Sequence, residues 1–208
     1  MAKPIIRAAF FCIVSACAGF THAGGGPLGI DHVVPMDNKG IWKRGVQDAV
    51  LGSVVLVNIG AALWEGGESR IGHTLWQSVD SMLISTVAAN GGKLIFTRAR
   101  PSQTDDPNQW FKGGHHYSFP SGEVAAASGI ITPFVLEYGK DNPAVWALEL
   151  LPAYFSVARV KTHAHWQTDV LAGWAVGTAS GYYAHSLDSP WTLRLLPHGA
   201  MVGFHKDW

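Results

Sequence analysis

The chain has 208 residues, with 15 basic and 15 acidic side chains and a formal net charge of zero. Apolar residues make up 48% of it and charged residues only 14%. This length fits one domain with a full core and excludes two ordinary domains. Because no basic run is present, nucleic acid is excluded as an expected partner.

The first 23 residues have the layout of an export signal. Lys3 and Arg7 precede an apolar stretch over residues 8–20, and small residues follow it. We therefore predict a signal peptide over residues 1–23 and a periplasmic or otherwise exported protein. In an alternative interpretation, the four residues that end at Cys17 resemble a bacterial lipobox, which would make Cys17 a lipoprotein anchor.

Residues 24–43 are rich in Gly, Pro, Asp and Asn, which predicts an extended lead-in. An apolar helix follows over residues 49–64 and ends at a pair of glycines. Its apolar run over residues 50–64 is shorter than the roughly 20 residues that cross a bilayer. Later apolar stretches would bury Asp80 or Glu149 at membrane depth, which is costly. The pattern favours a water-soluble bundle over an integral membrane protein, and peripheral membrane contact remains an alternative.

Pro and Gly residues delimit further helices, with a long loop over residues 101–119. The helices are predicted at 70–98, with a break at Gly91-Gly92, and at 121–138, 143–159 and 166–186. Pro133 and Pro152 lie inside two of these segments, so kinks or earlier helix ends are expected there.

Gly173, Gly177 and Gly181 recur every four residues in the last predicted helix, which favours close approach of a neighbouring helix. Beyond this helix, Pro197-His198-Gly199 lies between two apolar arms and predicts a small hairpin. The expected fold is therefore all-α: a single-domain helical bundle over residues 24–208 with a small C-terminal hairpin.

Three sets of residues have the chemistry of an anion site. Lys93 and Arg100 are seven residues apart, so on a helix they share a face and reach one anion. Ser121 and Gly122 stand at a predicted helix start, where free N–H groups favour phosphate. Each set taken alone also fits a structural role, as a solvated helix face or an ordinary helix cap.

The third set is a histidine with a carboxylate one helical turn later. His165 and Asp169 are four residues apart, so Asp169 is expected to accept a hydrogen bond from one imidazole nitrogen while the other faces a substrate. Arg159 precedes them by six residues. No cluster of metal ligands accompanies these residues in the sequence.

In order and spacing, these sets resemble the signature of the type 2 phosphatidic acid phosphatase superfamily, which includes class A acid phosphatases and vanadium haloperoxidases. That signature reads K-x6-R-P, P-S-G-H and S-R-x5-H-x3-D. The matching block covers residues 93–169. The chain departs from the signature at Glu123, where the family has histidine, and at Ala158, where it has serine.

The resemblance implies a metal-independent phosphatase without a cofactor, in which vanadate acts as an inhibitor or analogue. It implies that His165 is the nucleophile, forms a phosphohistidine and is oriented by Asp169. The residues that would hold the phosphate oxygens are Lys93, Arg100, Ser121, Gly122 and Arg159. The implied substrate is a phosphorylated small molecule or a lipid headgroup, carried as a phosphomonoester or a diphosphate.

Because Glu123 stands where the family has histidine, the sequence does not identify the residue that gives a proton to the leaving group. Glu123 itself is one candidate for a catalytic acid, and His115 or His116 from the preceding loop are substitutes. Two further functions remain alternatives: an envelope protein that binds phosphorylated lipid or glycan with little turnover, and a vanadate-dependent haloperoxidase.

Overall fold

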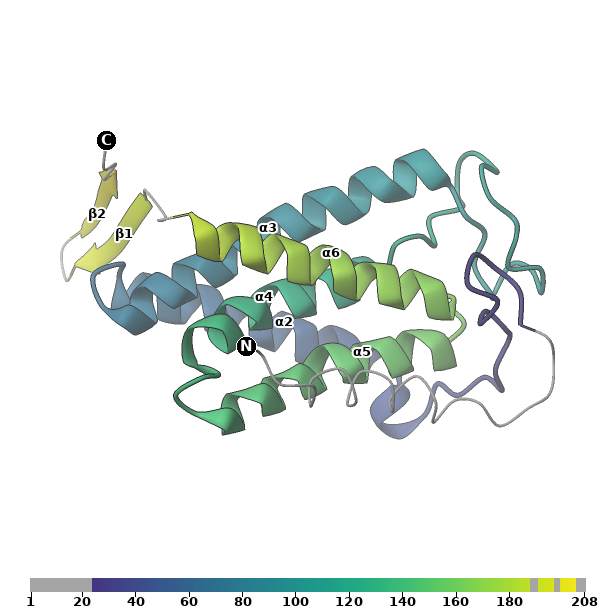
Figure 1. Cartoon of the computed structure of the whole chain (residues 1–208), viewed down its shortest axis with the longest axis horizontal. Helices are drawn as coiled ribbons and strands as arrows, with labels where there is room; N and C mark the ends of the chain where they lie inside the picture. The colour runs from purple at the N-terminus through teal and green to yellow at the C-terminus, as the bar shows by residue number, and fades with distance from the viewer. Residues whose placement is uncertain (1–23, 188–190, 197–198, 205–208) are drawn as a thin grey trace.

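The structure is a computed structural model that describes residues 24–187, 191–196 and 199–204. Helices dominate it, which confirms the predicted all-α class (Figure 1). The predicted signal peptide and Cys17 lie outside the described residues. The helices in chain order are η1 (Gly40–Trp42), α2 (Arg44–Glu65), α3 (Arg70–Phe96), α4 (Gly122–Tyr138), η2 (Pro143–Glu149), α5 (Leu150–Lys161) and α6 (Gln167–Ser186). The expected hairpin is formed by β1 (Trp191–Leu196) and β2 (Gly199–Phe204), which pair antiparallel.

Several helix boundaries differ from those expected. Helix α3 continues through Gly91-Gly92 and ends at Phe96, where Thr97 adopts a left-handed conformation with φ 34°. The segment predicted over 143–159 divides into η2 and α5, with Pro152 near the start of α5, where a missing N–H is tolerated. Helix α4 continues past Pro133 to Tyr138, so no earlier end occurs there.

Helix α4 is the central element of the core. Most of its side chains from Val124 to Val135 are buried. One group of them packs with Met82 of α3, and another packs with Phe155 of α5 and Val170 of α6. Helix α4 therefore fixes the relative positions of the helices whose ends carry the predicted site residues.

The glycines of α6 allow it to lie directly against α4, as predicted. A Cβ atom at Gly173 would come closer than 3.0 Å to the carbonyl oxygen of Ser121, and one at Gly177 would do the same at Ala125. At Gly181 the neighbour would be the side chain of Thr132. Because two of these contacts are with backbone, which cannot rotate away, glycine is required for this packing.

Substituting Gly177 with alanine should therefore destabilise the fold. The added methyl group would push α6 away from α4, and we expect the free energy of unfolding to fall by about 1–3 kcal/mol, as for other overpacked cores. Urea denaturation measures the change. Gly60→Ala is the matched control, because an added Cβ there meets nothing within 4 Å. Gly60→Ala should raise the free energy of unfolding by about 0.5–1 kcal/mol. If both variants instead lost the same stability, the packing role of Gly177 would be contradicted.

Helix α2 is longer than its apolar run suggested. Its 22 residues make it the one helix in the described part of the chain that is long and apolar enough to cross a membrane. Only 17% of its most apolar window is buried, and Leu56, Val57 and Trp64 are strongly exposed. Length and composition alone are weak evidence for a span, but the expectation that this segment is too short no longer holds.

The loops that hold the predicted site gather at one end of the bundle, opposite the hairpin (Figure 1). The end of α3, the starts of α4 and α6 and the turn after α5 meet there. The lead-in, predicted to be extended, instead folds back through a bridge between Gly25 and Asp31. This turn brings Asp31 to the start of α6, where it accepts a hydrogen bond from the backbone N–H of Thr168 at 2.8 Å.

Candidate active site

A cavity of about 710 Å³ opens at this end of the bundle. Its lining includes most of the side chains that the sequence singled out, drawn from five segments far apart in the chain. These lining residues are Lys93, Arg100, Gly122, Glu123, Arg159 and His165. The three sets of residues predicted to form an anion site are therefore brought together.

Lys93 and Arg100 reach the cavity by a route that differs from the predicted one. Because α3 ends at Phe96, Arg100 lies in the following loop and not on the helical face of Lys93. Its guanidinium contacts the carbonyl oxygen of Tyr117 at 3.4 Å. Burial lowers the pKa of both side chains, and the neighbouring charge of Arg100 lowers the pKa of Lys93 further. Two partly buried cations thus face the same space, which favours an anion between them.

The start of α4 contributes an unoccupied hydrogen-bonding group beside these cations. Ser121 precedes the helix, is fully buried, and its hydroxyl has no hydrogen-bond partner among the described residues. A Cβ atom on Gly122 would lie 3.0 Å from Nζ of Lys93, so the ammonium lies close to the helix terminus. Hydroxyl, backbone N–H groups and ammonium are the donors from which an oxyanion cradle is built, and of the three residues Lys93 and Gly122 line the cavity whereas Ser121 does not.

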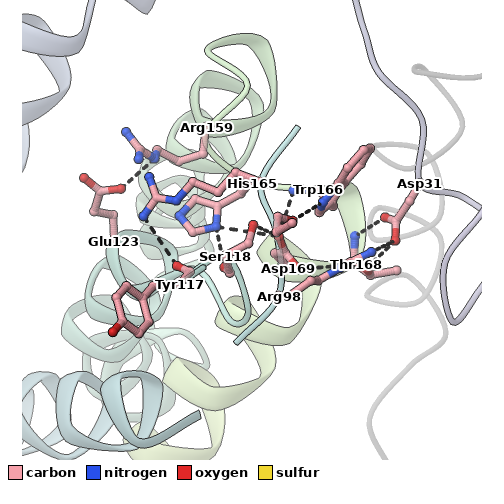
Figure 2. Close-up of polar contacts among 12 residues, drawn as sticks. Asp31, Arg98, Tyr117, Ser118, Glu123, Arg159, His165, Trp166, Thr168 and Asp169 are labelled. Carbon is pink, nitrogen blue, oxygen red and sulfur yellow. Dashed lines mark hydrogen bonds and ion pairs between the residues drawn. The ribbon is translucent and has the colours of Figure 1, made fainter. Parts of the chain in front are cut away.

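His165 is held by a backbone carbonyl. Its Nδ1 donates to the carbonyl oxygen of Ser118 at 2.6 Å, while the carboxylate of Asp169 lies 3.7 Å away (Figure 2). The direct hydrogen bond predicted between His165 and Asp169 is therefore not formed. With the proton on Nδ1, the other ring nitrogen, Nε2, carries the free lone pair.

Burial lowers the pKa of His165, and the charges of Arg100 and Lys93 act in the same direction against the opposing effect of Asp169. The imidazole is therefore kept neutral, as a nucleophile requires.

Asp169 organises the ring indirectly. Its carboxylate accepts hydrogen bonds from the hydroxyl of Ser118 at 2.5 Å and from the backbone N–H of Trp166 at 2.9 Å. Burial alone raises the pKa of this carboxyl, but the interactions with His165, Arg98 and Ser118 outweigh it, so the pKa lies below the ordinary value. Asp169 thus stays ionised and holds the residues on both sides of His165 in place.

Arg98 is a site residue that the sequence did not reveal. It is fully buried and bridges two carboxylates, donating to Asp169 at 2.5 Å and to Asp31 at 2.6 Å (Figure 2). Its guanidinium also lies over the rings of Trp110 and Trp166, at 4.3 and 5.5 Å from their centroids. The family signature selects Arg100, seven residues after Lys93, and includes neither Arg98 nor Asp31, so no sequence motif pointed to these two residues.

Glu123 is engaged by two arginines. One carboxylate oxygen forms an ion pair with Nε of Arg159 at 2.6 Å, and the other forms an ion pair with Arg44. Figure 2 shows Glu123 and Arg159 facing each other. Gln47 accepts a further hydrogen bond from Arg159 at 3.1 Å. Arg44, at the start of α2, lines the cavity and was also missed by sequence reasoning.

The two loop histidines do not line the cavity. His115 is exposed and its carbonyl oxygen accepts from Gln103, and His116 contacts the same glutamine at 3.3 Å. Neither is therefore placed to substitute for the family histidine. The described residues also contain no group of three or more His, Cys, Asp or Glu side chains that could hold a metal ion.

The cavity has an apolar side as well as a charged one. Leu51 and Val55 of α2, Met82 of α3 and Ala126 of α4 line it beyond the cations. An oxyanion held by the cradle would therefore have a hydrophobic wall next to it. The arrangement can bind a phosphate group, present a neutral imidazole to it and accommodate an apolar substituent.

This combination of fold and site is that of a phosphate-handling helical domain, and comparison with known families agrees. The family model of the PAP2 superfamily matches residues 74–192, more than half of the chain. The chain therefore belongs to the PAP2 superfamily, the type 2 phosphatidic acid phosphatases that its motifs resemble.

Two curated relatives match over the same region. A lipid A 1-phosphatase of Porphyromonas gingivalis is 32% identical over 119 residues, which are 57% of this chain and 24% of the relative. An undecaprenyl-diphosphatase of Sulfolobus acidocaldarius is 29% identical over 122 residues, 58% of this chain and 56% of the relative. The matched region thus spans only about a quarter of the length of the first relative and just over half of the length of the second. A crystal structure of Aquifex aeolicus LpxE, 16% identical, aligns over 89% of this chain and 88% of its own with a TM-score of 0.45.

Removing Arg98 should destabilise the protein strongly. Arg98→Leu leaves two buried carboxylates without a counter-charge, and we expect a loss of about 3–5 kcal/mol in the free energy of unfolding at neutral pH. The loss should shrink as the pH falls, because protonation of the buried Asp169 removes an unpaired charge. Urea denaturation at pH 7 and at about pH 4.5 measures both effects.

Arg70→Leu is the matched control for this experiment. Arg70 also pairs with two carboxylates, those of Glu137 and Asp141, but its side chain is half-exposed. Surface ion pairs contribute little because water screens them, so a much smaller loss is expected. Equal losses in the two variants would contradict the importance of the buried bridge.

Proposed function

We propose that this protein is an exported phosphatase that removes phosphate from a phosphomonoester or diphosphate attached to a lipid. The observation that carries the proposal is the single cavity in which the neutral imidazole of His165, the cations Lys93 and Arg100, and an apolar wall meet. The layout of residues 1–23 supports export. The two relatives named as lipid A 1-phosphatase and undecaprenyl-diphosphatase support the reaction class and the lipid-linked substrate.

In this mechanism His165 attacks the phosphorus atom through Nε2. The P–O bond to the leaving group breaks, and the phosphoryl group is carried as a phosphohistidine until water hydrolyses it. Positive charge grows on the ring during the attack. The carbonyl oxygen of Ser118, which accepts a hydrogen bond from Nδ1–H, and the carboxylate of Asp169, 3.7 Å away, both stabilise this charge. The non-bridging oxygens are held by Lys93, Arg100, Arg159, Ser121 and the N–H groups at Gly122. Such a site accelerates the reaction by positioning and by charge stabilisation.

The apolar side of the cavity suggests how a lipid would be accommodated. Helices α2 and α3 supply most of it, and both also expose large apolar side chains outward, including Val57 and Trp64 on α2 and Val87 and Leu94 on α3. Contiguous exposed apolar surface commonly marks contact with a membrane or a partner. Peripheral contact of these helices with a lipid surface would present the headgroup to the cations while the chain stays among apolar residues.

The proposed nucleophile is tested by release of inorganic phosphate from a long-chain alkyl phosphate and from a polyprenyl diphosphate. We expect the purified protein to hydrolyse at least one of them, and His165→Asn to lower kcat by a factor of at least about 10³, because covalent catalysis is lost. His73→Asn, a histidine on α3 that does not line the cavity, is the matched control. Full activity of His165→Asn would refute the assignment.

A second candidate function is binding of phosphorylated lipid or glycan with little turnover. The ion pair of Glu123 with Arg159 favours it, because a phosphate must compete with an internal carboxylate for this guanidinium. Titration with vanadate or phosphate, followed by the hydrolysis assay, separates the two functions: binding without phosphate release supports the second. Bromide oxidation with added vanadate tests the haloperoxidase alternative in the same preparation.

The lowered pKa of Lys93 predicts an alkaline limit to activity. Burial and the charge of Arg100 hold this pKa below the ordinary 10.5, so the ammonium loses its proton, and with it the attraction for phosphate, at a lower pH than an exposed lysine would. We therefore expect kcat/KM to decline on the alkaline side before pH 10.5. Lys93→Arg keeps its charge and should move this decline to higher pH. Profiles from pH 7 to 11 measure it, and an unmoved descending limb would assign it to another group.

A further inference from the structure

The proposed reaction needs a proton for the leaving oxygen, and Glu123 is poorly placed to supply it. Both of its carboxylate oxygens are held in ion pairs, one by Arg159 and one by Arg44. Each oxygen is therefore directed at a guanidinium group and not at the space where a leaving group would lie. Glu123 is therefore a positioning residue, whose negative charge keeps two guanidinium groups side by side at the edge of the cavity.

The other titratable residues in the cavity lining leave few candidates for the proton donor. The arginines that line it stay protonated throughout the accessible pH range. His165 is the proposed nucleophile, and the ammonium of Lys93 lies at the helix terminus where phosphate oxygens would bind. His115 and His116 do not reach the cavity. His163 is the remaining titratable residue in the lining.

The backbone at His163 is held in a conformation that most residues avoid. Its φ is 55°, in the left-handed region that favours glycine or asparagine. The turn between α5 and α6 is fixed there, because the carbonyl oxygen of His163 accepts a hydrogen bond from the backbone N–H of Ser102 at 3.0 Å. Strained non-glycine residues cluster at functional sites, where the surrounding structure sustains them.

The ring of His163 is oriented by the lead-in segment. Its Nε2 lies 2.6 Å from the carbonyl oxygen of Val34, an acceptor only, so the proton resides on Nε2. Nδ1 is then the nitrogen left to bind and release a proton. When Nδ1 is protonated, the carbonyl still accepts from the imidazolium, so both states of a proton donor keep the same orientation.

We propose that His163 donates the proton to the leaving group, in place of the histidine that the family has at position 123. The inference rests on the phosphatase function proposed above. In the first step Nε2 of His165 bonds to phosphorus, the ester P–O bond breaks, and the leaving oxygen takes the proton from Nδ1 of His163. In the second step water attacks the phosphorus, the bond between phosphorus and Nε2 of His165 breaks, one proton of the water goes to Nδ1 of His163, and inorganic phosphate leaves.

The charged groups around the cavity set the conditions for this step. They are Arg44 of α2, Lys93 of α3, Arg100 of the loop, Glu123 of α4, Arg159 of α5 and His165 of the turn before α6. Because the cations outnumber the carboxylate, the lining attracts an anion. A bound phosphate would therefore lie in the same cavity lining that includes His163.

Two substrates with different leaving groups test the assignment. 4-Nitrophenolate is a stable anion that departs without a proton, whereas the alkoxide of decyl phosphate must be protonated as it leaves. His163→Asn suits the left-handed backbone, but its amide has no proton to transfer. We expect it to lower kcat/KM for decyl phosphate by about 10²–10⁴-fold and to leave kcat/KM for 4-nitrophenyl phosphate within about tenfold of the unmodified protein, because kcat/KM reports the steps up to phosphohistidine formation and not the later hydrolysis.

A second variant and two comparisons make the result decisive. His163→Gly also tolerates positive φ, and added imidazole should restore its turnover of decyl phosphate, which no structural defect would allow. Glu123→Gln and His116→Asn should leave the ratio of the two rates unchanged. An unchanged ratio in both His163 variants, or a ratio that shifts in Glu123→Gln or His116→Asn instead, overturns the proposal while the phosphatase function stands. Hydrolysis of neither substrate by the unmodified protein overturns the function itself, and the proton donor with it.

Discussion

The buried bridge of Arg98 between Asp31 and Asp169 is the interaction on which the rest of the site depends. Burying a guanidinium and two carboxylates is costly unless each charge is paired and each polar atom is satisfied. Here Thr168 donates to Asp31, Ser118 donates to Asp169, and two tryptophan rings cover the cation. The bridge therefore forms only when the lead-in, the loop after α3 and the start of α6 are all in place.

This requirement explains how a site built mostly from loops becomes ordered. Asp169 connects Arg98 to Ser118, and the carbonyl of Ser118 in turn orients His165. His165, the proposed nucleophile, is thus positioned through a chain of contacts that begins at Asp31, 134 positions earlier in the sequence. Helix packing supports the same geometry, because the close contact at Gly173 places α6 directly against Ser121 at the start of α4.

A second charged group lies at the edge of the cavity and differs in character from the first. Arg44, Glu123 and Arg159 form ion pairs that are partly exposed, and a bound phosphate would offer the two arginines another anion. The interior bridge is fully buried and holds the surroundings of His165, whereas this outer group lines the cavity that a substrate would enter. With Glu123 at the position of the family histidine, both oxygens of its carboxylate are paired, and the proposal made above assigns the proton donor to His163 in the same cavity lining.

The sequence alone determined the helical segments, the hairpin and the residues of the anion site. Apolar runs bounded by Gly and Pro locate α2, α3, α4 and α6, because hydrophobic periodicity and helix ends are local properties of a chain. The spacing of Lys93 from Arg100 and that of Arg159 from His165 are local as well, and these four residues line one cavity. Only the tertiary structure decided the contacts of Asp31, Arg44, Arg98 and His163, and the acceptor that holds His165. Those contacts join segments far apart in the chain, and which side chains meet depends on how the helix ends converge around α4, a geometry that spacing along the sequence does not specify.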